Sequence, residues 1–283
     1  RLSRIGEEVI ISCSKESVKL RALNSTKSAL PVQTFSNQFF DSYIYSTLQP
    51  SLSYQIRSSV LSRFLKDLEN IESFEFNVDC NLHMLIMKTV DKFGITHVDQ
   101  LYLEKTVVME AVYNTEEYPG NSLLKCNEIA GIDSFFRGVR LISISLEEAN
   151  CLTISSEDED SAMKTSFTLK NGEFCETKIT KCKFPKVLFP LRDFLIGQQL
   201  CRLDNQRMKI FIPEPGSPIV VQANMCGLVL FEMAIATLPE EEDEQHGIEQ
   251  ASATRISSTR VTADSDPFSM PFNGKKRSSW FTL

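Results

Sequence analysis

Three short segments near the start of the chain are the most informative about the fold: Leu2-Ser3-Arg4-Ile5-Gly6, Leu23-Asn24-Ser25-Thr26-Lys27-Ser28-Ala29 and Phe35-Ser36-Asn37-Gln38-Phe39-Phe40. Between the first and the second lie two runs rich in aliphatic and β-branched residues, 9–13 and 18–23. Short runs of this kind, bounded by polar segments, are typical of β-strands. The opening therefore predicts a β-rich fold.

The same pattern continues in two similar halves, one ending near Tyr113 and the other running from about Leu123 to Leu238. Each half has strand-like runs interrupted by helices of roughly a dozen residues. The predicted strands are 9–13, 18–23, 74–79, 82–90, 95–103 and 107–113 in the first half, and 141–146, 151–155, 164–169, 174–180, 208–212, 219–222 and 228–238 in the second. The excess of strands over helices indicates an antiparallel α+β fold.

Helices are predicted at 58–70, 127–138 and 190–203. In the first, the apolar residues share one arc, and Arg63 and Lys66 fall on the opposite side. In the second, Arg137 faces away from a group made of Ile129, Ile132, Phe135 and Phe136. A solvated helix face is the simplest explanation of these basic residues, and a lining that meets DNA phosphates is the alternative.

Composition limits the classes of protein to consider. The 283 residues, 42% of them apolar, are enough for two domains and a tail. We expect no membrane span, because no run of 18 or more apolar residues occurs. We also expect no secretory signal, because no charged and then apolar leader is visible in the sequence given. The net charge of −7 argues against a surface coated with basic residues but permits a local basic patch.

The eight cysteines are scattered and form no CxxC pair, and the chain has only three histidines. Zinc requires thiolate or imidazole ligands clustered at short spacing. We therefore expect no metal, no cofactor and no disulfides, but buried thiols in a reducing compartment such as the nucleus or cytosol.

Polar stretches mark the boundaries of the predicted domains. Residues 114–122 have the composition of a linker, with Pro119 and Gly120, and the acidic run 157–160 is expected to connect strands. An acidic run at 240–244, followed by serine, threonine and charged residues, predicts a disordered tail. The predicted parts are a first domain at 1–113, a connector at 114–122, a second domain at 123–238 and a tail at 239–283.

The opening segments resemble the Rad-nine family, the largest subunit of the heterotrimeric DNA-damage checkpoint clamp. Further segments carry the resemblance through the body in matching order and spacing: Ser59-Val60-Leu61-Ser62-Arg63-Phe64, Lys92-Phe93-Gly94-Ile95-Thr96-His97, Glu110-Ala111-Val112-Tyr113, Pro190-Leu191-Arg192-Asp193-Phe194, Pro215-Gly216-Ser217-Pro218-Ile219 and Ala236-Thr237-Leu238. Together they cover about the first 238 residues.

The resemblance implies a DNA-clamp fold similar to the replicative clamp PCNA, with two similar domains whose sheets lie outside and whose helices line a ring. Arg63, Lys66, Arg137 and Arg192 would then face the DNA. The implied partners are two other PCNA-like subunits, double-stranded DNA, a clamp loader, and a checkpoint mediator and kinase that bind the tail. The implied location is the nucleus.

The family begins with a strand and most of a helix before the position that matches Leu2. Either the sequence given is truncated at its start, or the first domain lacks that strand and that helix, in which case its sheet is incomplete.

The tail ends in a basic and then aromatic segment, Lys275-Lys276-Arg277-Ser278-Ser279-Trp280-Phe281. Similar endings occur in the family, and an aromatic pair in a flexible segment is a typical partner anchor. Thr262 and Ser265 lie beside acidic residues and are candidate phosphorylation sites.

The principal hypothesis is therefore a non-catalytic clamp subunit that encircles DNA at damage sites and recruits signalling and repair proteins. A 3′–5′ exonuclease is the enzyme alternative, but two-metal chemistry needs converging carboxylates, and the acidic runs at 157–160 and 240–244 fall in segments read as solvated. A replicative clamp, or a scaffold of clamp ancestry that forms no ring, are the remaining alternatives.

Overall fold

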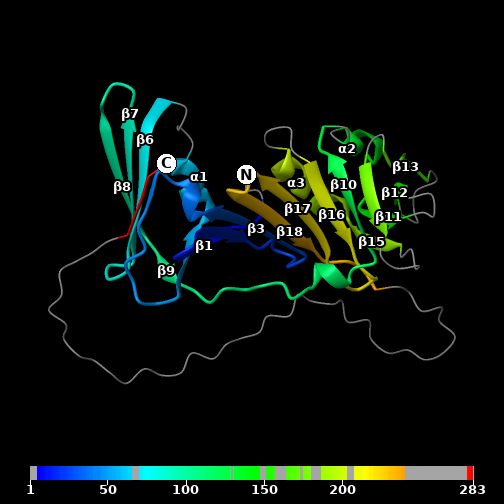
Figure 1. Cartoon of the computed structure of the whole chain (residues 1–283), viewed down its shortest axis with the longest axis horizontal. Helices are drawn as coiled ribbons and strands as arrows, with labels where there is room; N and C mark the ends of the chain where they lie inside the picture. The colour runs from blue at the N-terminus through cyan, green and yellow to red at the C-terminus, as the bar shows by residue number, and fades with distance from the viewer. Residues whose placement is uncertain are drawn as a thin grey trace, which may run out of the picture. The chain divides into compact units, whose positions relative to one another are not determined.

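The structure is a computed structural model that describes residues 5–65, 70–127, 129, 131–146, 151–156, 164–172, 175–179, 186–202, 207–239 and 279–282. These residues form mainly antiparallel strands with a few short helices, as Figure 1 shows, which confirms the predicted α+β class. The chain separates into two compact units. The first unit comprises Leu2–Ala22, Gln33–Glu110 and Ser258–Leu283, and the second comprises Arg1, Leu23–Val32 and Ala111–Ser257.

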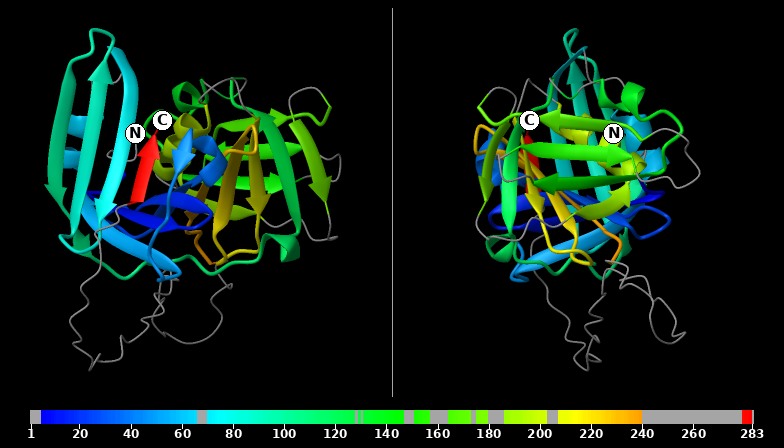
Figure 2. Two further views of the ribbon diagram at one scale, coloured as in Figure 1. Left: turned by 60° about the vertical axis from the view of Figure 1, so that its left-hand side comes forward. Right: turned by 90° about the vertical axis from the view of Figure 1, so that its right-hand side faces the viewer.

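The first unit contains two sheets. One has the order β3-β2-β1-β5-β9, formed by β1 (Glu8–Ser14), β2 (Ser17–Ala22), β5 (Ser51–Arg57), β9 (Glu104–Lys105) and the residues of β3 (Ala29–Ser36) that belong to this unit. The other has the order β4-β19-β6-β7-β8, formed by β4 (Ser42–Tyr43), β19 (Ser279–Thr282), β6 (Ile71–Asp79), β7 (Met84–Asp91) and β8 (Thr96–Tyr102). The 3-10 helix η2 (Asn37–Phe39) precedes β4, and α1 (Ser58–Phe64) joins β5 to β6. The left view of Figure 2 shows β6, β7 and β8 side by side.

Alternation of apolar residues fixes the register between β1 and β5. Val9, Ile11 and Cys13 on β1 lie opposite Ile56, Tyr54 and Leu52 on β5, and all six are buried. A slip of one residue would turn this whole set toward solvent, so burial of one face specifies the pairing.

The second unit repeats this arrangement. One sheet has the order β13-β12-β11-β15, formed by β11 (Leu141–Leu146), β12 (Leu152–Ser156), β13 (Ser166–Leu169) and β15 (Val187–Pro190). The other runs β14-β10-β16-β17-β18, formed by β10 (Gly120–Lys125), β14 (Cys175–Ile179), β16 (Arg207–Ile212), β17 (Ile219–Met225) and β18 (Val229–Ile235). The helical segments are η4 (Thr115–Glu117), α2 (Ile132–Phe135) and α3 (Leu191–Cys201).

The strand orders of the two units correspond element by element. β3-β2-β1-β5 matches β13-β12-β11-β15, and β4-β19-β6-β7-β8 matches β14-β10-β16-β17-β18. α1 and α3 occupy equivalent places, because each follows the last strand of the first series and precedes β6 or β16. The counterpart of β10 is β19, which comes from the end of the chain rather than from the start of the unit. In the sheet order, β19 thus lies between β4 and β6, as β10 lies between β14 and β16.

Several predicted elements differ from the observed ones. Residues 107–113 form no strand, because this segment is held by side chains rather than by a neighbouring strand. The predicted linker 114–122 already contains the start of β10 at Gly120. The helix predicted at 127–138 is reduced to α2, and Phe135 is 57% exposed instead of packing with Ile132 and Phe136. The strands β3, β4, β5, β9, β10 and β15 were not predicted.

Within the predicted tail, residues 279–282 form β19. These residues gain backbone partners on both sides, from β4 and from β6. The rest of the predicted disordered tail, apart from Pro239, lies outside the described residues.

Candidate functional surfaces

The helix α3 presents one of the predicted basic residues. It starts after Pro190, whose φ of −66° suits the approach to a helix, and it buries Leu191, Phe194 and Leu200. At Gly197 an added Cβ would lie 3.3 Å from Met233 Sδ, so the missing side chain lets α3 pack closely on β17 and β18. Arg192 is exposed on this helix.

The neighbouring Asp193 does not share that exposure. It is 5% exposed, and its Oδ2 accepts a hydrogen bond of 2.8 Å from Ser28 Oγ. Asn24 Nδ2 donates at 3.4 Å to the same carboxylate, and Asn24 Oδ1 accepts from the backbone N–H groups of Ser28 and Ala29. The turn at 24–29, part of the opening segments, therefore holds the acidic side chain inside the second unit. Arg192 is therefore exposed, whereas the carboxylate of the adjacent Asp193 is buried and hydrogen-bonded to Ser28 and Asn24.

Two hydrogen bonds to backbone carbonyl oxygens join α3 to the segment that contains α2. Leu191 N donates to Arg140 O at 2.9 Å, and the buried side chain of Gln198 donates through Nε2 to Ile129 O. Arg137 and Arg140 are exposed in that segment. We call Arg137, Arg140 and Arg192 the arginine surface of the second unit. Helical spacing predicted an exposed position for Arg137, the family resemblance supplied Arg192, and Arg140 was missed.

In the first unit, Arg63 is exposed in the last turn of α1, and Lys66 lies outside the described residues. Leu61 on the other side of α1 is buried, which agrees with the predicted apolar arc. Arg63 therefore lies on the exposed side of α1.

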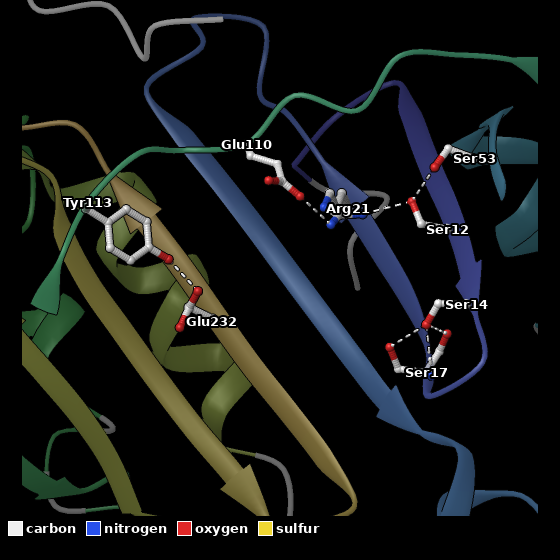
Figure 3. A network of polar contacts seen from close by, with 8 residues as sticks. All are labelled: Ser12, Ser14, Ser17, Arg21, Ser53, Glu110, Tyr113 and Glu232. Atoms are coloured by element: carbon white, nitrogen blue, oxygen red, sulfur yellow. Dashed lines mark hydrogen bonds and ion pairs between the residues drawn. The ribbon is translucent and has the colours of Figure 1, made fainter. Parts of the chain in front are cut away.

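One end of the connecting segment 106–119 is tied to the first unit through a buried arginine. Arg21 on β2 is 5% exposed, and it donates to Ser12 Oγ at 2.8 Å and to Glu110 Oε1 at 3.1 Å. Ser12 Oγ lies 2.9 Å from Ser53 Oγ, so the network continues to β5, as Figure 3 shows. Burial lowers the pKa of Arg21, and Glu110 opposes that change by favouring the charged guanidinium. Nothing in the local sequence distinguished this arginine from an exposed strand residue.

The other end of the segment is tied to the second unit. Tyr113 OH donates to Glu232 Oε1 on β18, and Gln222 Nε2 donates to Glu232 Oε2 at 3.0 Å (Figure 3). Burial and the bond to Glu232 both raise the pKa of the Tyr113 phenol. Tyr118 OH donates to Pro218 O at 2.7 Å. Between these anchors Val112 is 75% exposed, so the segment offers apolar side chains to solvent while its ends are fixed.

The C-terminal segment predicted as a partner anchor lies in the first unit. Ser279, Trp280, Phe281 and Thr282 are the register partners of Val78, Asn77, Phe76 and Glu75 on β6. On the other side, Phe281 and Thr282 pair with Tyr43 and Ser42 on β4. Lys275, Lys276, Arg277, Thr262 and Ser265 lie outside the described residues.

The described residues contain no group of three or more histidine, cysteine or acidic side chains that could hold a metal ion. Burial raises the pKa of the Cys13 thiol to about 12 and that of Cys126 to about 11, so both are protonated at neutral pH. The acidic runs at 157–160 and 240–244 lie outside the described residues. Within the described part of the chain, no helix is long and apolar enough to cross a membrane.

Comparison with known proteins agrees with these features. The sequence model of the Rad9 family matches residues 1–238. The "Cell cycle checkpoint control protein Rad9" of Drosophila melanogaster is 21% identical over 261 residues, covering 85% of this chain and 53% of the relative. The chain thus spans about half the length of the curated relative that it matches. Since the family model covers most of the chain, from the opening segments to the end of the second strand series, the chain belongs to the Rad9 family.

Proposed function

We propose that this chain is a non-catalytic subunit of a heterotrimeric checkpoint clamp that encircles double-stranded DNA in the nucleus. The observation that carries the proposal is the Rad9 family match over residues 1–238, together with the strand order that repeats in the two units. A duplicated two-sheet unit supports a DNA-clamp fold with two similar domains. The role in cell cycle checkpoint control is proposed from the name of the Drosophila relative.

The two sheet edges formed by β8 and β13 support assembly with two related subunits. In the described residues β8 is paired only with β7, and β13 only with β12. In the repeat, β8 corresponds to β18, and β13 corresponds to β3. In the sheet order, β18 is the neighbour of the part of β3 that belongs to the second unit. Pairing of β8 and β13 with strands of adjacent subunits would repeat that relationship. Successive head-to-tail contacts of this kind generate a closed ring and remove the open edges.

Contacts with DNA would come from Arg63, Arg137, Arg192 and Lys66, the residues predicted to line the ring. Arginines on helices contact phosphates without reading sequence, which suits a ring that must slide. A clamp loader would place the ring on DNA. The tail, through Lys275–Arg277, Trp280 and Phe281 and through phosphorylation at Thr262 or Ser265, would recruit the checkpoint mediator and kinase.

Co-purification with two other clamp subunits tests the proposal. We expect a single species of one-to-one-to-one stoichiometry in size-exclusion chromatography with light scattering. It should remain on a circular DNA in high salt and be released when the DNA is linearised, because a topological link is insensitive to screening. A stable homotrimer would favour a replicative clamp instead, and a chain that stays monomeric with both partners present would favour a scaffold.

The exonuclease alternative has a separate test. Metal-dependent shortening of end-labelled DNA by the pure chain, abolished by one carboxylate substitution, would establish it and contradict the non-catalytic proposal.

A further inference from the structure

The edge strand β8 has polar residues on the face that continues the core. Asp99 and Leu101 lie opposite Met87 and Leu85 on β7, which are both buried. Because directly opposite residues in an antiparallel pair share one face, Asp99 and Leu101 lie on the core face of the sheet, and His97 joins them by alternation. His97 is exposed, whereas Asp99 is half-buried and belongs to none of the ion pairs formed between described residues.

The outer face of β8, formed by Val98, Gln100 and Tyr102, carries large apolar side chains. Val98 is 54% exposed and Tyr102 is 82% exposed. β8 is the last strand of its sheet, separated from β19 by β6 and β7 (Figure 2, left). An antiparallel strand with one buried and one solvated face has apolar residues inside and polar residues outside. β8 has nearly the reverse distribution.

The second unit shows which residues occupy the matching strand when its core face is covered. Leu101 on β8 and Ile235 on β18 are corresponding residues, because each pairs with the first buried residue of the preceding strand. Two residues earlier, β8 has Asp99, whereas β18 has Met233, which is fully buried. A carboxylate therefore stands on β8 at the position of a core methionine.

The other edge of the chain, β13, has the ordinary distribution. Phe167 and Leu169 lie opposite two fully buried residues of β12, so they belong to the core face. The outer face of β13 has the hydroxyl side chains of Ser166 and Thr168. The ring centroid of Phe167 lies 5.7 Å from that of Phe135, which is 57% exposed. The core face at this edge is therefore apolar and reaches the solvent.

The two edges do not match each other. If β8 of one copy extended the sheet at β13 of another, Asp99 would lie among the apolar residues of β13 without a counter-ion. Burying a carboxylate without a partner is costly. On the outer face, Val98 and Tyr102 would meet hydroxyl side chains and gain no apolar contact. Natural sheets use inward-pointing charges on edge strands to prevent such pairing.

We propose that Asp99 prevents β8 from pairing with β13 of a second copy and selects the edge strand of a different clamp subunit. That strand brings a lysine or arginine to the core face beside Asp99, which satisfies the carboxylate. It also brings apolar side chains to the outer face against Val98 and Tyr102. A charge that only kept this edge solvated would leave those two large apolar side chains without a role. The identity of the selected strand as part of a clamp subunit rests on the proposed function.

Self-association of the chain alone tests the exclusion, measured by sedimentation velocity over a series of concentrations. The wild type should be monomeric. Asp99→Met, which introduces the residue found at the matching position of β18, should raise the association constant by about tenfold or more, because pairing no longer buries a charge. Asp99→Asn, which changes the shape of the side chain least, should act in the same direction with a smaller effect.

Two controls separate strand pairing from a general increase in apolar surface. Gln100→Met adds an apolar side chain to the outer face and keeps Asp99, so the chain should stay monomeric. Phe167→Asp, added to Asp99→Met, places a charge on the core face of β13 and should restore the monomer. The proposal would be overturned by a self-associating wild type, by folded Asp99 variants that all stay monomeric, or by association that persists with Phe167→Asp.

Asp99→Lys tests the selected partner, with the two other clamp subunits as the probe. The dissociation constant of the complex should rise by about tenfold or more, because like charges would meet on the core face. Gln100→Lys places the same charge on the outer face and should have a much smaller effect. A wild-type complex that Asp99→Lys joins equally well would overturn this inference alone. A wild-type chain that joins no complex would contradict the proposed function, and the self-association series would still decide the role of Asp99.

Discussion

Arg21 Nη2 lies 3.1 Å from Glu110 Oε1, and this ion pair joins a guanidinium that is 6% exposed to a carboxylate that is 70% exposed. The pair differs from an ordinary surface salt bridge, because loss of the acid leaves a buried charge without its counter-ion. It also attaches the start of the connecting segment to β2. The stability of the first unit and the position of this segment are therefore linked through one contact.

Glu110→Ala should lower the free energy of unfolding by about 1–2 kcal/mol, measured by urea denaturation. The matched control is Glu176→Ala, which breaks the ion pair of Arg207 Nη1 and Glu176 Oε1 at 2.7 Å, where the side chains are 53% and 61% exposed. An exposed pair of this kind should contribute less than about 0.5 kcal/mol. Equal losses in the two variants would contradict the importance of burial at Arg21.

Tyr113→Phe should free the second-unit end of the connecting segment. The hydroxyl donates to a carboxylate, and a bond to a charged group contributes about 1.5–3 kcal/mol. We expect faster hydrogen exchange across residues 111–118 than in the wild type. Tyr118→Phe, which removes a bond to the neutral Pro218 O, should have a smaller effect, and a larger one would argue against this ranking.

Gly120→Ala tests the close approach at the start of β10. An added Cβ would lie 2.5 Å from Leu146 Cδ1 and 2.9 Å from Lys178 O, and the backbone oxygen cannot move away easily. We expect a loss of about 1–3 kcal/mol in thermal or urea unfolding. At Gly131 the nearest atom would be Ser134 Oγ at 4.0 Å, so Gly131→Ala should be almost neutral.

Alkaline pH should destabilise the second unit through Cys126. Burial raises the pKa of this thiol to about 11, above the value of 9.0 for a free cysteine, so the folded state holds its proton more tightly than the unfolded state. The corresponding stability is fully present below pH 9 and is lost as the pH rises toward 11. Cys126→Ala should flatten the dependence of the unfolding free energy on pH between 9 and 11. A pH dependence that is the same in the wild type and in Cys126→Ala would contradict this assignment.

Charge removal from the arginine surface tests the DNA-facing assignment. In the assembled ring, Arg137→Gln and Arg192→Gln should each weaken binding to linear DNA and reduce the salt slope by about 1, if each side chain contacts one phosphate. Both residues are exposed, so stability should change by less than about 0.5 kcal/mol. Arg207→Gln, on the exposed pair with Glu176, is the charge-matched control. An unchanged salt slope in all three variants would remove these arginines from the DNA-facing surface.

The sequence predicted the strands whose apolar residues form compact runs. β11 was predicted with its observed bounds, and β1, β16 and β18 were found with small errors at their ends. The signal was strong there because these residues are buried between sheets, and burial is what hydrophobic patterning records. β5 was missed although Leu52, Tyr54 and Ile56 alternate with polar residues, which is the pattern of a half-buried strand.

The sequence alone determined the family and the α+β class, because both depend on the order and spacing of segments along the chain. Helical periodicity also predicted exposed faces for Arg63 and Arg137, although Arg137 lies outside the observed helix α2, and Arg192 came from the family resemblance alone. Only the tertiary structure decided which residues from distant segments meet: Arg21 with Glu110, Asp193 with the turn at Asn24, and the C-terminal strand with β6. Hydrogen bonds and ion pairs between such segments leave no periodic trace in the sequence, because they depend on where the sheets bring the chain together.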